Sequence, residues 1–180
     1  TLAQAIAGLQ LDGVGALFGF GQTQDFKDAT QVIGEADQGG LGLPDRDYYT
    51  KDDARSVELR KDYLGHVARM LELAGAKPKD AAREAQAIVD VETQLAKASL
   101  RNVDRRDPEK VYHRLERSGL ARKAPRFDWD TYFATLGTPG LQPINVVAPD
   151  FFAGLDELLA RTPPAALRPY LRWHLVHRQA

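Results

Sequence analysis

The sequence contains no cysteine, and this absence removes several kinds of chemistry. It excludes disulfide bonds, a thiolate nucleophile and metal sites built on cysteine. No stretch approaches the roughly 18 apolar residues of a membrane span, and no cationic and then apolar leader follows Thr1. Because the first residue is not methionine, we expect a processed protein or part of a longer one.

The chain also lacks a strong charge of either sign. Its 24 Lys and Arg residues nearly balance 25 Asp and Glu residues, and the formal net charge is -1. The whole chain therefore does not have the electrostatic character of a nucleic-acid-binding protein. The charge is uneven, however, because residues 1–50 are acidic and residues 101–126 are basic.

The basic stretch permits two interpretations. Arg101, Arg105 and Arg106, with Asn102, could contact an anionic ligand or a nucleic-acid backbone. The acidic residues interleaved with them instead favour ion pairs within the surface. Mixed-sign clusters are usually self-paired, which makes the second interpretation the stronger one.

The pattern of apolar residues predicts a mainly helical fold. Apolar residues at helical spacing predict helices over residues 2–9, 52–74 and 78–98, and Gly75 and Pro78 separate the last two. Residues 17–23 and 31–36 predict two short strands that form an antiparallel hairpin. Residues 38–50 predict an ordered connecting loop, whose adjacent tyrosines must pack.

The second half of the chain is predicted to contain shorter helices than the two longest of the first half. We expect a short helix that begins at Asp107-Pro108 and ends at Gly119, then a helix capped by Asp128. Residues 143–148 read as a short strand, and helices follow from residues 149 and 163. We expect one domain over residues 1–180, with hairpin and connector in 1–50 and helices in 51–180. The last helix carries an apolar stripe with Trp173 and Leu175 that no later residue covers, and in a longer protein we expect later helices to bury it. In this chain the stripe predicts either weak self-association, which we favour, or cover by local packing.

No complete catalytic or metal-binding set is recognisable. None of the four histidines begins a His-Glu-x-x-His pattern, and His174 and His177 form only an i, i+3 pair without a nearby acid. No serine lies in a Gly-x-Ser-x-Gly turn, and no phosphate-binding glycine loop occurs. Asp52 and Asp53 suit a helix start. We therefore predict no catalytic residue and no metal ligand in this chain, and leave the substrate-binding residues unassigned.

Several segments together resemble one family. Gly40-Leu-Gly-Leu-Pro-Asp-Arg-Asp-Tyr-Tyr49 is similar to a signature of the neprilysin-like zinc metallopeptidases. Further similar segments follow in family order over nearly the whole chain: Phe18-Gly-Phe-Gly-Gln22 with Asp25, Ile33 to Gln38, Glu92-Thr-Gln-Leu-Ala96, Arg105-Arg-Asp-Pro108 with Tyr112, Phe127-Asp-Trp129, Val146-Val-Ala-Pro-Asp-Phe-Phe152, and Leu167 with Tyr170-Leu-Arg-Trp173.

The resemblance implies a non-catalytic segment of the helical amino-terminal lobe, which encloses a peptide chamber in this family. The zinc-binding and catalytic motifs of the family would follow Ala180, so zinc is expected only in the longer parent. The implied partners are the carboxy-terminal catalytic portion and peptide substrates, with no nucleic acid, and the implied location is outside the cytoplasm. Two alternatives stay open: a stand-alone interaction module derived from the family, or a helical domain that binds an anion or nucleic acid through residues 101–126.

Overall fold

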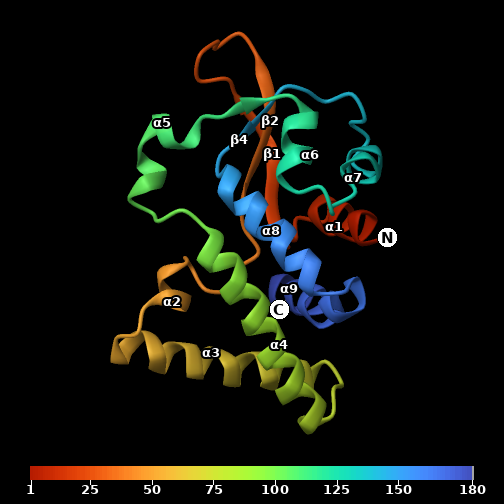
Figure 1. Cartoon of the computed structure of the whole chain (residues 1–180). Helices are drawn as coiled ribbons and strands as arrows, with labels where there is room; N and C mark the ends of the chain where they lie inside the picture. The colour runs from red at the N-terminus through yellow and green to blue at the C-terminus, as the bar shows by residue number, and fades with distance from the viewer. Residues whose placement is uncertain (180) are drawn as a thin grey trace.

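The computed structural model describes residues 1–179, and the fold is mainly helical with one small sheet. The hairpin lies at the top of Figure 1, and the two longest helices, α3 and α4, lie at the bottom. The helices are α1 (Leu2–Leu11), α2 (Asp47–Thr50), α3 (Ala54–Leu73), α4 (Pro78–Ala98), α5 (Pro108–Val111), α6 (Arg117–Lys123), α7 (Trp129–Thr135), α8 (Pro149–Arg161) and α9 (Arg168–Gln179). The strands are β1 (Phe18–Gln24), β2 (Val32–Gln38), β3 (Arg114–Leu115) and β4 (Ile144–Val146).

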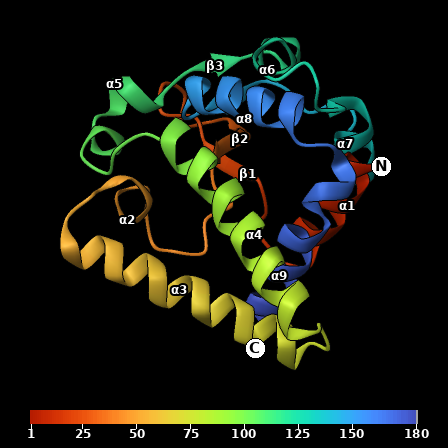
Figure 2. The same cartoon turned by 60° about the horizontal axis from the view of Figure 1, so that its bottom comes forward.

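The two long helices begin and end where the local sequence predicts. The Asp53 carboxylate accepts a hydrogen bond from the Ser56 backbone N–H and caps α3, and Gly75 follows the end of α3 with a left-handed φ of +93°. Pro78 occupies the first turn of α4, where its missing N–H is harmless. In Figure 2, α4 crosses the view with α3 on one side and α8 on the other.

The predicted hairpin is confirmed, but it belongs to a larger sheet. The strand order is β1-β2-β4-β3, with β1 antiparallel to β2 and β3 antiparallel to β4. The central pair β2 and β4 is parallel, with Gly34 opposite Ile144. The strand expected at residues 143–148 therefore joins the hairpin, which the local pattern alone does not reveal.

The expected helix from Asp107 to Gly119 is wrong. The chain forms only the single helical turn α5, and its backbone becomes extended at Tyr112. It then forms the strand β3, which is followed by α6. The His113 backbone N–H donates to the Asn145 side chain, and the Val146 N–H donates to the His113 carbonyl. These contacts with β4 compete with the helical hydrogen bonds, and tertiary pairing overrides the helical pattern.

An aromatic cluster fills the space between the hairpin and the helices that follow it. The Phe18 ring lies 5.3 Å from the rings of Phe127, Trp129 and Tyr132, and the Phe20 ring lies 5.3 Å from Phe133. Most of these contacts are tilted or edge-on, the arrangements that aromatic quadrupoles favour. We call the following set the aromatic core: Phe18, Phe20, Phe127, Trp129, Tyr132, Phe133 and Phe152.

The apolar stripe of the last helix is not left uncovered, which corrects the expectation of self-association through it. Trp173 is fully buried, and its ring lies 6.1 Å from that of Tyr63 on α3. Only Leu175 keeps substantial exposure, at 39%. Helix α9 packs against α3 and α4, and these earlier helices supply the cover that the sequence order hid.

Candidate functional site

The loop that carries the Gly40–Tyr49 motif is fixed at its start by a tyrosine from the other end of the chain. The Tyr170 hydroxyl donates to the Gly40 carbonyl at 2.9 Å and accepts from the Leu17 N–H at 2.9 Å. Gly40 has a φ of +74°, and a Cβ atom there would lie 2.3 Å from the Tyr170 oxygen. Glycine is therefore required at this position both by backbone conformation and by space.

A buried carboxylate fixes the end of the same loop. Glu92 on α4 has no solvent exposure, and its Oε2 accepts from the Tyr49 hydroxyl at 2.7 Å. Its Oε1 accepts from the Tyr63 hydroxyl on α3 at 3.0 Å. Burial, and then the adjacent Glu92 charge, raise the pKa of both tyrosines, so both keep the proton that they donate.

Helix α9 completes this cluster. His174 Nε2 lies 3.4 Å from Glu92 Oε1, and the imidazole is 5% exposed. The Trp173 indole N–H donates to the Tyr63 hydroxyl at 3.0 Å. We call the set Tyr49, Tyr63, Glu92, Trp173 and His174 the polar junction. It joins the motif loop to α3, α4 and α9 through one carboxylate.

The polar junction was not foreseen in the sequence, although a signal for it was present. Glu92 occupies a position on the apolar stripe of α4, between Val89 and Leu95, where a charged residue needs a buried partner. No acid lies near His174 along the chain, but the fold brings Glu92, 82 positions earlier in the sequence, into contact with it. Within residues 1–179, no three His, Cys, Asp or Glu side chains gather closely enough to hold a metal ion.

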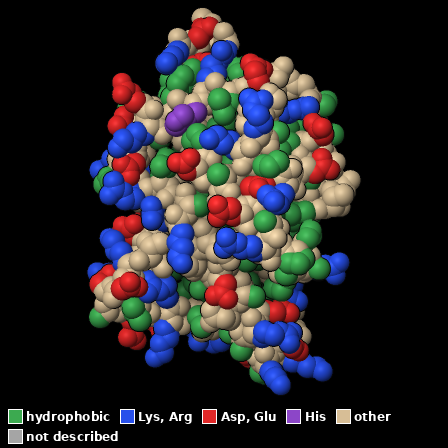
Figure 3. Space-filling view, in the orientation of Figure 1, with side chains coloured by type: hydrophobic (Ala, Val, Ile, Leu, Met, Phe, Trp, Pro, Cys, Tyr) green, Lys and Arg blue, Asp and Glu red, His purple; other side chains and the backbone are tan. Residues whose placement is uncertain are grey.

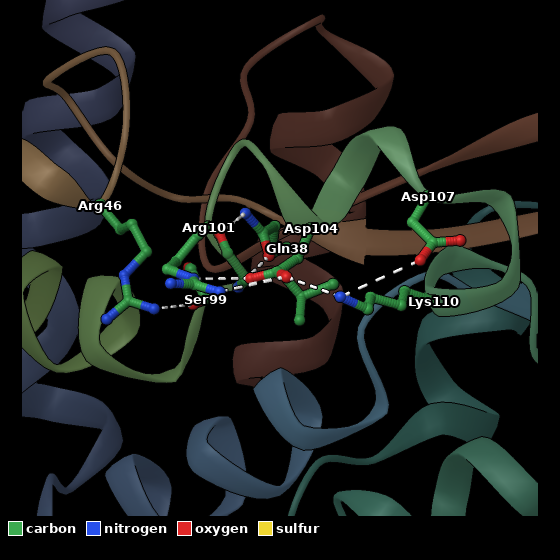
Figure 4. A network of polar contacts seen from close by, with 8 residues as sticks. Gln38, Arg46, Ser99, Arg101, Asp104, Asp107 and Lys110 are labelled. Carbon is green, nitrogen blue, oxygen red and sulfur yellow. Dashed lines mark hydrogen bonds and ion pairs between the residues drawn. The ribbon is translucent and has the colours of Figure 1, made fainter.

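A second polar group holds the carboxyl end of α4, as Figure 4 shows. Arg46 Nη1 donates to the Ser99 carbonyl at 2.9 Å, which places a cation at the negative end of the helix dipole. The Gln38 side chain accepts from the Leu100 N–H at 2.7 Å and donates to the Leu100 carbonyl. A hollow of about 360 Å³ lies beside these groups, and Asn102 and Arg105 also line it.

The basic stretch is largely paired with carboxylates. Arg105 makes a bidentate contact with Asp37 on β2, with nitrogen to oxygen distances of 2.9 and 2.7 Å. Arg101 and Lys110 both contact Asp104, which lowers the pKa of that carboxyl to about 2. The remaining pairs are Arg114 with Asp25, Arg117 with Asp130, and Arg126 with Asp156. In Figure 3, acidic and basic side chains are likewise intermixed over the visible face.

An open groove of about 680 Å³ lies between the motif loop and α3. Leu43, Pro44 and Tyr48 form its loop side, and Tyr63 and His66 contribute from α3. Tyr49, next to Tyr48, is buried at 4% exposure, as predicted for a packed loop. The polar junction thus fixes the back of the loop, and the front of the loop forms one wall of the groove.

Nothing in the described part of the chain meets the length and apolarity of a membrane-crossing helix.

Two comparisons then place the chain among known proteins. A family model described as Peptidase family M13 matches residues 1–180. Mouse endothelin-converting enzyme 1 is 31% identical over 159 residues, which cover 86% of this chain and 20% of that protein. Neprilysin-3 of Drosophila melanogaster is 27% identical over 171 residues, or 89% of this chain and 22% of that protein.

Solved structures agree with the sequence relatives. The Mycobacterium tuberculosis zinc metalloprotease Zmp1, in complex with an inhibitor, superposes with a TM-score of 0.89 at 34% identity. That match covers 96% of this chain and 26% of that one. PepO from Lactobacillus rhamnosis shares the fold, with a TM-score of 0.72 at 20% identity. This chain therefore spans about a fifth to a quarter of its relatives and belongs to the amino-terminal portion of peptidase family M13.

Proposed function

We infer that this chain is a non-catalytic wall of the peptide chamber in a longer zinc-dependent endopeptidase. Its support is the family match over residues 1–180, in a chain that spans only 20% of mouse endothelin-converting enzyme 1. The names of these relatives, endothelin-converting enzyme and zinc metalloprotease, describe enzymes that act on peptides or proteins. On this proposal the parent enzyme hydrolyses peptides and operates outside the cytoplasm.

The zinc would be held elsewhere in the parent. Among residues 1–179 the one close acid and imidazole contact is part of the polar junction, and its carboxylate already accepts two tyrosine hydroxyls. A two-residue set enclosed in this way does not fit a catalytic zinc, which takes three protein ligands and keeps an open position for water. No step of the peptidase reaction is therefore assigned to a residue of this chain.

A wall must keep its shape while peptides enter, and the polar junction supplies a means of doing so. Glu92 binds the motif loop through Tyr49 and helix α3 through Tyr63. The groove lies on the other side of the same loop, so its wall is backed by buried hydrogen bonds. We assign the groove to the chamber-facing side, where its shape would select the peptides that fit.

The test uses the full-length parent enzyme with one bulky substitution on the groove and a matched one away from it. Lys61→Trp fills the groove, and Lys79→Trp changes another exposed helical lysine that does not line it. We expect Lys61→Trp to reduce cleavage of long peptides more than that of short ones, with zinc content unchanged. Lys79→Trp should leave the length dependence as it is.

Three outcomes would overturn the proposal. The first is loss of bound zinc in the Lys61→Trp enzyme, since that would place this chain in the metal site. The second is an unchanged length limit after deletion of the whole segment from an enzyme that stays folded. The third is chelator-sensitive peptide cleavage by the purified 180-residue chain alone, which would make it catalytic.

A further inference from the structure

The outer edge of β1 presents unpaired main-chain groups, and the hydrogen bonds at its two ends show which ones. At the loop end, the Asp25 N–H donates to the Gln31 carbonyl at 3.0 Å, so Asp25 faces β2. At the other end, the Phe18 N–H donates to Ala16, and the Phe18 carbonyl accepts from the Gln10 side chain at 2.9 Å. Phe18 therefore faces away from β2.

Main-chain groups alternate between the two sides of an antiparallel strand. Since Phe18 points outward and Asp25 points inward, the N–H and C=O groups of Phe20, Gln22 and Gln24 also point outward. None of these six groups has a hydrogen-bond partner in residues 1–179. The strand order places β1 at the end of the sheet, so no further strand among these residues covers it.

This edge carries none of the features that usually protect an edge strand. Natural sheets blunt exposed edges with charged side chains, proline or a bulge. Residues 18–24 contain no charged residue and no proline, and they pair with β2 in an unbroken register. Gly21, Gln22 and Gln24 are exposed to solvent. The edge is therefore both unprotected and accessible.

We propose that the β1 edge from Phe20 to Gln24 binds an extended peptide by strand addition, a role that rests on the proposed peptidase function. Alternating donors and acceptors along a strand are matched by the main chain of another extended polypeptide. Five residues span about 17 Å. Five residues are far fewer than the roughly 20–30 that each partner contributes to a stable protein interface, which favours a short peptide over a second copy.

The glycines of β1 define the side chains that such a peptide would carry. Gly19 and Gly21 alternate with Phe18 and Phe20, so one face of the strand has no side chain at these two positions. A Cβ atom at Gly21 would meet nothing within 4 Å. A bulky apolar side chain on the added strand fits beside Gly21, where it can cover bare backbone. The preferred ligand is thus an uncharged peptide with a large apolar residue at its centre.

The first test measures amide hydrogen exchange in the 180-residue chain with the probe acetyl-Gln-Val-Phe-Val-Gln-amide. We expect at least tenfold slower exchange at Phe20, Gln22 and Gln24, and little change at Gly21 and Thr23, which already face β2. A second probe carries N-methyl groups on the residues whose N–H must face β1. This second probe should bind at least tenfold more weakly.

A pair of proline substitutions provides the matched control in the protein. Gln22→Pro removes an outward N–H from the proposed edge, where proline is tolerated in strands. Val32→Pro removes an N–H on the other side of the hairpin, at the first residue of β2. We expect Gln22→Pro to weaken probe binding at least tenfold and Val32→Pro to leave it within twofold.

The proposal fails if the N-methylated probe binds as well as the unmodified one, or if protection appears at other strands. It also fails if the edge amides are protected without peptide as protein concentration rises, since a second copy would then occupy the edge. Protection of these amides in the full-length parent without peptide would assign them to another segment of that protein. Failure here with a positive groove test would leave the chamber-wall function intact.

Discussion

The aromatic core and the polar junction hold two ends of the same molecule by different means. In the aromatic core, Phe18 contacts several rings, and Trp129 and Tyr132 each need only one hydrogen bond, to Ala124 and Gln10. In the polar junction, Glu92 serves two tyrosines and lies beside a histidine. The first is held mainly by apolar burial, and the second by a small number of directed contacts.

The difference affects how each region tolerates change. Apolar packing is non-directional, so a side chain of similar volume can replace another at modest cost. A buried hydrogen-bond network tolerates substitution poorly, because the loss of one member leaves the others without hydrogen-bond partners in a medium of low polarity. We therefore expect the polar junction to be the more brittle region, although it contains fewer residues.

The largest expected effect in the polar junction is that of Glu92→Ala. It removes the acceptor of both tyrosine hydroxyls and the acid beside His174, and should lower the free energy of unfolding by about 3–5 kcal/mol. Glu92→Gln keeps the shape and one acceptor, and should cost less. Urea unfolding of both variants measures the difference. A loss below about 1 kcal/mol for Glu92→Ala would mean that the junction contributes little to stability.

Gly42→Ala tests the junction without removing any polar group. A Cβ atom at this position would lie 1.8 Å from the Tyr63 oxygen and 3.1 Å from Glu92 Oε1, so the hydroxyl must move. We expect a loss of about 1–3 kcal/mol from overpacking. Gly15→Ala is the control, because its added Cβ meets nothing within 4 Å. Equal melting temperatures for the two variants would contradict the tight fit around Tyr63.

Phe18→Leu tests the opposite side of the comparison. Phe18 is fully buried in the aromatic core, but leucine retains most of its apolar volume. We expect the free energy of unfolding to fall by about 1.5 kcal/mol, less than for Glu92→Ala. Phe18→Ala, which opens a cavity, should cost about 3–5 kcal/mol. If Phe18→Leu proves more damaging than Glu92→Ala, the aromatic core is the more brittle region.

Asp104→Asn should give the smallest effect, because Asp104 belongs to neither region and forms surface ion pairs. Contacts with Arg101 and then Lys110 lower its folded pKa to about 2, from 3.8. Its stabilisation is therefore complete above pH 3.8 and is lost as pH falls toward 2. The variant should show a shallower loss of stability over that window, measured by urea unfolding at several pH values. The control is Asp62→Asn, because Asp62 forms no ion pair with a described residue. The dependence of its stability on pH should match that of the unsubstituted chain.

Local signals in the sequence were sufficient for the long helices and the hairpin. Asp128 caps the helix that it was expected to cap, and Asp53 lies at the expected helix start. Gly75 and Pro78 separate α3 from α4. Such features depend on residues a few positions apart, and their physics is local. The parallel pairing of β2 with β4 and the loss of the helix near Tyr112 depend on partners that are distant in sequence.

The same distinction applies to the candidate site. The resemblance of Gly40–Tyr49 to a family signature identified the loop, and its two tyrosines predicted that it packs. The role of Glu92 followed from neither, since its partners come from three different elements. A carboxylate on an otherwise apolar helix face indicates that a buried partner exists, but only the fold identifies that partner.

The parallel pairing of β2 with β4 also bears on the order in which the chain folds. The hairpin joins neighbouring residues, whereas Gly34 and Ile144 are separated along the chain by α3, α4 and the shorter elements that follow them. Contacts between distant residues close large loops and slow folding. We therefore expect the hairpin and the α3–α4 pair to form early during synthesis. The sheet would then stay incomplete, with β2 unpaired on one side, until about residue 146 has been made.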